Sequence, residues 1–64
     1  MTRLEVDGVT HYASQIRGTT VFYMPNMKDG WHLAGWLRED GTYTVCETEA
    51  LMQKLVTAWR LRLN

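Results

Sequence analysis

The chain has 64 residues, of which seven are basic and seven acidic, so its formal net charge at pH 7 is zero. This length allows one small core, and we expect a single compact domain over residues 1–64. The neutral balance argues against nucleic-acid binding, which usually requires a basic surface. The single Cys cannot form an internal disulfide. The charged start is unlike a signal peptide, and no apolar run approaches the roughly 20 residues that span a bilayer. We therefore expect a cytoplasmic protein.

Large side chains are frequent for so short a chain, which has three Trp and four Met residues. Aromatic and Met side chains are enriched at the cores of protein interfaces, which favours a binding function. A tiny core also needs large side chains to fill it, so the same composition fits a purely structural role.

The first half of the chain predicts a series of antiparallel strands joined by glycine-containing turns. Asp7-Gly8 favours a two-residue type I′ turn, because both central positions need a positive φ, and this turn pairs Val6 with Val9. Pro25 is expected to end the third strand, and residues 26–30 are expected to form a turn-rich connection.

A second reversal is expected at Ile16-Arg17-Gly18. If these residues form a three-residue loop with Gly18 in the left-handed conformation, Ala13 pairs with Val21. Gly18 at another offset would give a different register. The predicted first face of the sheet holds Leu4, Val6, Val9, His11, Ala13, Val21 and Tyr23. The predicted opposite face holds Arg3, Tyr12, Thr20 and Phe22.

The segment 31–46 predicts a second hairpin, for which two registers compete. A two-residue loop at Asp40-Gly41 pairs Leu37 with Thr44 and mixes polar with apolar residues on both faces. A three-residue loop ending in Gly41 pairs Leu37 with Tyr43 instead. The second register is favoured because it gathers apolar residues on one face, namely Trp31, Leu33, Leu37, Tyr43 and Val45. The opposite face then holds His32, Ala34, Trp36, Arg38, Thr42, Thr44 and Cys46.

This register places Trp31 and Trp36 on opposite faces of the sheet, because their separation is odd. Trp36 then lies on the face away from the covering helix. Gly35 qualifies this prediction, since a glycine inside a strand often marks a bulge, and a bulge would bring both Trp residues to one face. We favour the strand without a bulge.

A C-terminal helix is predicted over about residues 48–63. Thr48 suits the N-cap, Glu49 suits the first turn, and Arg60 and Arg62 suit the last turn. One apolar stripe follows helical spacing and consists of Leu51, Met52, Leu55, Val56, Trp59 and Leu63. The predicted fold is thus α+β, with an antiparallel sheet of four to five strands over about residues 2–46 packed on one helix.

The sequence carries no catalytic signature. His11, His32 and Cys46 are the only side chains suited to a soft metal, and they lack the paired spacing of a zinc site. Cys46 and His32 could be drawn as a nucleophile pair, but nothing supplies a third orienting residue. We expect no metal, no cofactor and no enzymatic activity.

The remaining candidate is the sheet face away from the helix. We expect its binding residues to be Trp36, Arg38, Tyr12, Phe22 and Arg3. Exposed aromatic side chains beside Arg are typical of protein hot spots, and they also suit stacking on single-stranded nucleic acid. A second copy of the chain covering this face, as a homodimer, is a further interpretation.

The junction of hairpin and helix, Gly41-Thr-Tyr-Thr-Val45 followed by Thr48-Glu-Ala50, resembles that of the arm-type DNA-binding domains of phage integrases. The resemblance implies DNA binding through the sheet, but this sequence lacks the basic sheet face of that family. The short, neutral, Trp- and Met-rich chain is also similar to small phage or mobile-element accessory proteins that bind and inhibit host proteins. We therefore expect a small non-enzymatic protein-interaction module, with a nucleic-acid-binding module as the alternative.

Overall fold

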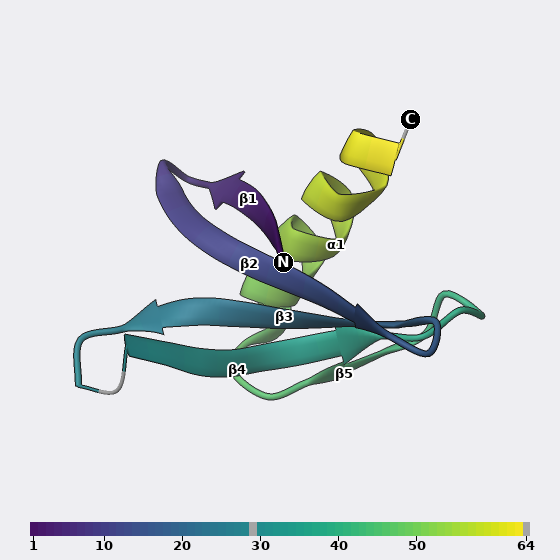
Figure 1. The fold of residues 1–64 in the computed structure, drawn as a ribbon, viewed down its shortest axis with the longest axis horizontal. Coiled ribbons are helices and arrows are strands. Elements are labelled where there is room, and N and C mark those ends of the chain that lie inside the picture. Colours follow the sequence, from purple (N-terminus) through teal and green to yellow (C-terminus); the bar gives the residue numbers. More distant parts are fainter. Residues whose placement is uncertain (29, 64) are drawn as a thin grey trace.

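The computed structural model describes residues 1–28 and 30–63 and confirms the predicted α+β class. A five-stranded antiparallel sheet packs on one C-terminal helix (Figure 1). The elements in chain order are β1 (Thr2–Val6), β2 (Val9–Ile16), β3 (Thr19–Asn26), β4 (Gly30–Leu37), β5 (Tyr43–Val45) and α1 (Glu49–Leu63). The strands follow one another in the sheet as they do in the sequence, so β1 and β5 form its two edges.

The first turn has the predicted conformation. Asp7 and Gly8 have φ values of 52° and 76°, as a type I′ turn requires, and Val6 pairs with Val9. This turn fixes which residues of β1 and β2 face the helix. Leu4 and Val6 are buried there beside His11 and Ala13.

The predicted register of the second turn is wrong by one residue. Arg17 and Gly18, with φ values of 50° and 84°, form a two-residue turn, and Ile16 pairs with Thr19 instead of lying in the loop. Ala13 therefore pairs with Phe22, where the prediction paired it with Val21. Because strand side chains alternate between faces, this shift exchanges the two faces of β3. Thr20 and Phe22 are buried under the helix, while Val21 and Tyr23 lie on the opposite face.

Pro25 does not end the third strand, contrary to the prediction. It lies within β3 and pairs with Trp31 of β4. The pairing of β3 with β2 stops at Tyr23, so Pro25 occupies a part of β3 that has only one neighbouring strand. A residue without an N–H group is tolerated at such a position.

The second hairpin has the predicted three-residue loop, because Leu37 pairs with Tyr43. The Arg38 N–H donates to the Thr42 carbonyl at 2.8 Å, and the Gly41 N–H donates to the Arg38 carbonyl at 3.1 Å. Gly41 has a φ of 92°, the left-handed conformation of this loop type. The Thr42 hydroxyl and N–H both donate to the Asp40 carboxylate, and these hydrogen bonds lower the pKa of Asp40.

Strand β4 contains a bulge, so the prediction of a regular strand is wrong. Phe22 pairs with Gly35 but Tyr23 pairs with Leu33, which leaves Ala34 as the extra residue. The buried Ala34 uses its carbonyl to accept the N–H groups of Cys46 and Glu47, at 3.0 and 3.2 Å. These bonds turn the chain from β5 towards the helix and satisfy a carbonyl that the ladder leaves unpaired.

The bulge decides the placement of both tryptophans in β4. The loop at Gly41 fixes the strand on its C-terminal side, so Leu37 faces the helix and Trp36 faces away, as predicted. On the N-terminal side the alternation is reversed. Trp31 and Leu33, which were expected to face the helix, therefore share the face of Trp36.

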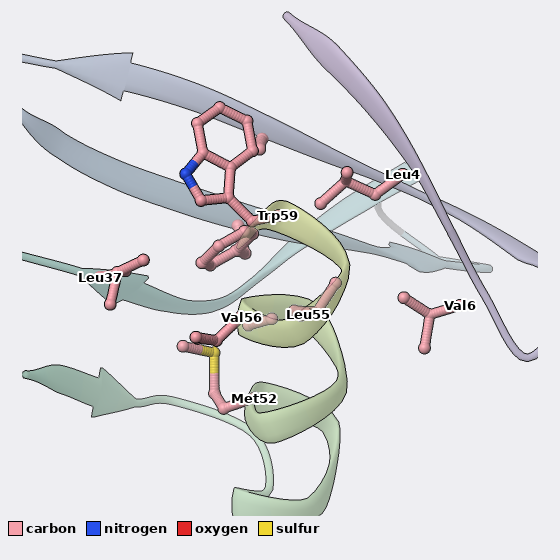
Figure 2. Close-up of a cluster of buried hydrophobic side chains, with 10 residues drawn as sticks. Leu4, Val6, Leu37, Met52, Leu55, Val56 and Trp59 are labelled. Carbon is pink, nitrogen blue, oxygen red and sulfur yellow. The ribbon is translucent and has the colours of Figure 1, made fainter. Parts of the chain in front are cut away.

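Helix α1 closes the core from one side of the sheet and contacts both β1 and β4. Thr48 is its N-cap, as predicted, because the Thr48 hydroxyl accepts the Leu51 N–H at 3.2 Å. Figure 2 shows the buried helix residues beside side chains from the sheet. The buried apolar residues are Leu4, Val6, Ala13, Phe22, Ala34, Leu37, Met52, Leu55, Val56 and Trp59. Leu51 packs at the margin of this cluster, and the side chain of Leu63, the last member of the predicted stripe, lies outside the described residues.

We expect Gly35→Ala to lower the free energy of unfolding by about 3 kcal/mol or more. A methyl group at Gly35, which has a φ of 153°, would lie 2.3 Å from the Thr44 carbonyl oxygen and 2.6 Å from the Met52 sulfur. Gly8→Ala is the matched control, because Gly8 also has a positive φ but nothing lies within 4 Å of its added methyl. Its loss should be about 1–2 kcal/mol. Urea denaturation of both variants tests this. Equal decreases in the free energy of unfolding would show that the close approach at Gly35 does not contribute to stability.

We also expect Tyr43 to make stability depend on alkaline pH. The Tyr43 hydroxyl donates to the Glu49 carboxylate at 2.5 Å, and this bond raises the pKa of Tyr43. In the unfolded chain the pKa of a tyrosine is about 10. Because the pKa of Tyr43 is higher in the folded protein, the hydrogen bond contributes its full stabilisation at pH values below the unfolded-state pKa. This stabilisation is lost as the pH rises through the folded-state pKa. The free energy of unfolding of Tyr43→Phe should therefore fall less than that of the wild type above pH of about 10. Parallel pH profiles of the two proteins would contradict the expectation.

Candidate interaction surface

The sheet face away from the helix is rich in aromatic residues. Cross-strand pairing places Tyr12 beside Tyr23, Tyr23 beside Leu33, and Val21 beside Trp36. Together with Trp31 these residues form what we call the aromatic face: Tyr12, Val21, Tyr23, Trp31, Leu33 and Trp36. They come from β2, β3 and β4, the three central strands, so the sheet holds their backbones in fixed register.

Tyr12 and Trp31 meet across the aromatic face in an edge-to-face contact. Their ring centroids are 4.6 Å apart and their planes are inclined by 77°. This geometry is favourable for aromatic pairs and restricts both rings. Trp31 nevertheless stays 47% exposed.

A hollow of about 400 Å³ opens beside this aromatic pair and is lined by Met1, Tyr12, Tyr23 and Trp31. Its lining includes three aromatic rings and no charged side chain. Such a hollow can receive an apolar side chain of a binding partner, with the tyrosine hydroxyls available as hydrogen-bond donors or acceptors.

Arg38 borders the same face beyond Trp36. Its guanidinium group donates to the Thr42 hydroxyl at 3.3 Å and to the Thr44 hydroxyl. Both acceptors are neutral, and within residues 1–28 and 30–63 no carboxylate lies within 4.0 Å of this group. The two threonines orient the guanidinium and leave its positive charge without a close ion-pair partner.

Arg3 lies at the opposite border of the face, on β1. Its Nε atom is 3.7 Å from the Glu5 carboxylate, which also accepts the Thr10 hydroxyl at 2.8 Å. The charge of Arg3 is therefore balanced by its own strand. The aromatic face as a whole thus combines aromatic and aliphatic side chains with Arg38 at its rim, a cation with no carboxylate within 4.0 Å among the described residues.

Four of the five predicted binding residues lie on or beside this face: Tyr12, Trp36, Arg38 and Arg3. Phe22 does not, and its assignment to the surface is wrong. Its side chain is 0% exposed and packs edge-to-face against Trp59, with ring centroids 6.4 Å apart. The one-residue shift at the second turn is the physical reason.

Sequence reasoning also missed several residues of the aromatic face. Val21 and Tyr23 were displaced by the wrong turn at Gly18, and Trp31 and Leu33 by the omitted bulge. The signals for the correct placement were present, because Arg17-Gly18 can form a two-residue turn and Gly35 is a typical bulge residue.

The residues considered for metal binding or catalysis are dispersed. His32 Nε2 lies 3.3 Å from the Glu47 carboxylate, whereas His11 is buried and its Nδ1 atom lies 3.0 Å from the Val9 carbonyl oxygen. Cys46 is exposed, and no hydrogen bond connects it with His32 in the described part of the chain. Among the described residues, no three His, Cys, Asp or Glu side chains cluster to hold a metal ion. The described helix is also too short and too polar to cross a membrane.

Truncating the surface and core tryptophans should have different effects on stability. Trp36→Ala should lower the free energy of unfolding by about 1 kcal/mol, because Trp36 is half-buried among cross-strand neighbours on the sheet face that the helix does not cover. Trp59→Ala should cost about 3–5 kcal/mol, because Trp59 is buried between the helix and the sheet. Thermal or urea denaturation of both variants tests this difference. Equal losses would show that Trp36 belongs to the core.

The aromatic face has to be interpreted from its own chemistry. Comparisons with protein-family models, with curated proteins and with solved structures give no match to this chain. Function is therefore inferred from the arrangement of aromatic rings, hydroxyl groups and the Arg38 charge.

Proposed function

We propose that this chain is a non-enzymatic protein-interaction module that binds a folded partner protein through its aromatic face. The observation that carries the proposal is the clustering of two Trp and two Tyr residues on three adjacent strands, outside the core. Trp, Tyr and Arg are the residues that contribute most to protein–protein binding energy. A partially exposed face of this kind gains free energy when a partner excludes water from it.

The charge of the face supports a protein partner over a nucleic acid. A nucleic-acid surface needs several uncompensated cations along the phosphate path. Here Arg3 is paired with Glu5, and Arg38 is the cation that borders the aromatic centre. A single oriented guanidinium matches one carboxylate on a partner protein. The fitting partner surface therefore has an apolar side chain for the hollow at Trp31 and an Asp or Glu opposite Arg38.

The proposed setting is the cytoplasm. Cys46 is a free and exposed thiol, which is compatible with a reducing compartment.

The test is affinity capture with matched variants, followed by a binding measurement on the purified partner. Wild-type protein and Leu61→Ala, a control on the exposed part of the helix, should retain the same partner. Trp31→Ala and Trp36→Ala should weaken its binding by about 30-fold or more while the variants remain folded. Arg38→Gln should weaken it by about tenfold, and less so at high salt.

Two outcomes contradict the proposal. Equal loss of binding in Leu61→Ala and in the tryptophan variants would move the site off the aromatic face. Retention on DNA or RNA that decreases steeply with salt, and that requires Trp31 and Trp36, would instead establish the nucleic-acid-binding alternative.

A further inference from the structure

Strand β1 is an open edge of the sheet. The strand order leaves β1 and β5 with one neighbour each, and β5 has three residues whereas β1 has five. An edge strand presents backbone N–H and C=O groups that can pair with another chain. In Figure 1 the β1–β2 hairpin curves away from β3 and β4 and lies beside the helix, so its outer edge does not face β5.

The turn at Asp7-Gly8 determines which backbone groups point outward. The type I′ turn makes Val6 and Val9 a hydrogen-bonded pair, because a turn joins its first carbonyl to its last N–H. Hydrogen-bonded and non-hydrogen-bonded pairs alternate along an antiparallel ladder, so the next hydrogen-bonded pair is Leu4 with His11. The N–H and C=O groups of Arg3 and Glu5 therefore point away from β2, towards the open edge.

The charges on either side of Leu4 are complementary to those of a second, antiparallel copy of β1. If a second copy of β1 runs antiparallel with Leu4 opposite Leu4, Arg3 of each copy lies directly opposite Glu5 of the other. Both residues have outward-pointing backbone groups, so the two pairs are hydrogen-bonded pairs as well as ion pairs. Both side chains are exposed and lie on the same face, where they already form a 3.7 Å contact within one chain.

Other registers lack this complementarity. A shift by two residues places Glu5 opposite Glu5 or Arg3 opposite Arg3, and like charges directly opposite are unfavourable. A shift by one residue pairs outward-pointing backbone groups with inward-pointing ones, which cannot bond. The parallel arrangement in register also aligns equal charges. Among the antiparallel registers, the one about Leu4 places both Arg3–Glu5 pairs opposite each other with matching hydrogen-bond parity.

The β1 edge is bordered by a hollow on its helix side. A groove of about 490 Å³ runs between β1 and the helix, lined on one side by Glu5, Val6 and Asp7 and on the other by helix residues that include Ala50, Ala58 and Leu61. The small side chains of Ala50 and Ala58 permit a close approach, and Leu61 is 69% exposed. The ion pair between Lys54 and Asp7, at 2.6 Å, lies at the turn end of the groove.

We propose that two copies of this chain associate through β1, antiparallel about Leu4, and form one continuous sheet. Both helices then lie on the same side of that sheet, and the groove of each copy borders the new interface. This interface goes beyond the proposed function, because it leaves the aromatic face open in both copies. The dimer would present two aromatic faces side by side to a partner.

The test is a charge-swap series followed by sedimentation equilibrium. Arg3→Glu and Glu5→Arg each place like charges opposite one another at both symmetric positions, and each should weaken dimerisation by about tenfold or more. The double variant Arg3→Glu/Glu5→Arg restores opposite charges and should dimerise like the wild type. Trp36→Ala is the control and should leave dimerisation unchanged. Circular dichroism establishes that every variant is folded.

Amide hydrogen exchange provides a second readout that does not depend on mutation. The Arg3 and Glu5 amides should exchange rapidly in dilute protein and become protected as the concentration rises, while the Leu4 amide is protected throughout. A chain that stays monomeric at the concentrations used for NMR would overturn the proposal. So would a dimer in which the double variant fails to recover, or in which Trp36→Ala alone abolishes association.

Discussion

The rest of the structure depends on the close contact of Met52 and Thr44 with the backbone of Gly35. At this point β4 has neither a side chain nor a regular ladder, so the helix can approach the sheet directly. The carbonyl of the neighbouring bulge residue, Ala34, accepts the two N–H groups that lead the chain out of β5. One irregular position therefore connects the second hairpin, the entry to the helix and the centre of the core. A regular strand would use the Ala34 carbonyl in the ladder, whereas the bulge leaves it available for Cys46 and Glu47.

The three tryptophans are placed by three different features: Trp59 by the helix, Trp36 by the loop at Gly41 and Trp31 by the bulge. Trp59 fills the space between the helix and the sheet, where it packs against Phe22. The bulge turns Trp31 away from the helix, onto the face that already holds Trp36. A sheet in a two-layer domain usually has one apolar face towards the core and one polar face towards water. Here both faces are apolar over the central strands, and the second face is covered by no element of the described chain. This distribution is the structural basis of the proposed interaction surface.

The sequence was sufficient to predict elements whose signals are local. The helix with its Thr48 cap, the type I′ turn at Asp7-Gly8 and the loop closed by Gly41 were each predicted from the residues that form them. Registers between strands were harder to predict, because a turn that is one residue longer or shorter has nearly the same local sequence requirements but changes every strand pair. At Arg17-Gly18, two turn lengths satisfy the need for a positive φ, and the burial of Phe22 makes the choice only once the helix is in place. The bulge at Ala34 likewise depends on Cys46, Glu47 and Met52, which are distant in sequence. For this reason Trp36 and Tyr12 were correctly placed on the candidate surface, whereas Phe22 was not and Trp31 was missed.

The charges on β1 affect which strands can pair with the exposed edge of this small domain. Charged residues on edge strands usually prevent association, because they repel or must be desolvated when another strand approaches. That effect is strongest when an edge carries charges of a single sign. Arg3 and Glu5 instead have opposite signs and stand symmetrically about Leu4. In the proposed dimer this pattern therefore places opposite charges across the new strand pair. An unrelated strand would have to reproduce the same alternation to gain the same pairs. In the two proposed interfaces, the β1 edge would select its partner by the order of its charges, whereas the aromatic face would select by shape and by a carboxylate opposite Arg38.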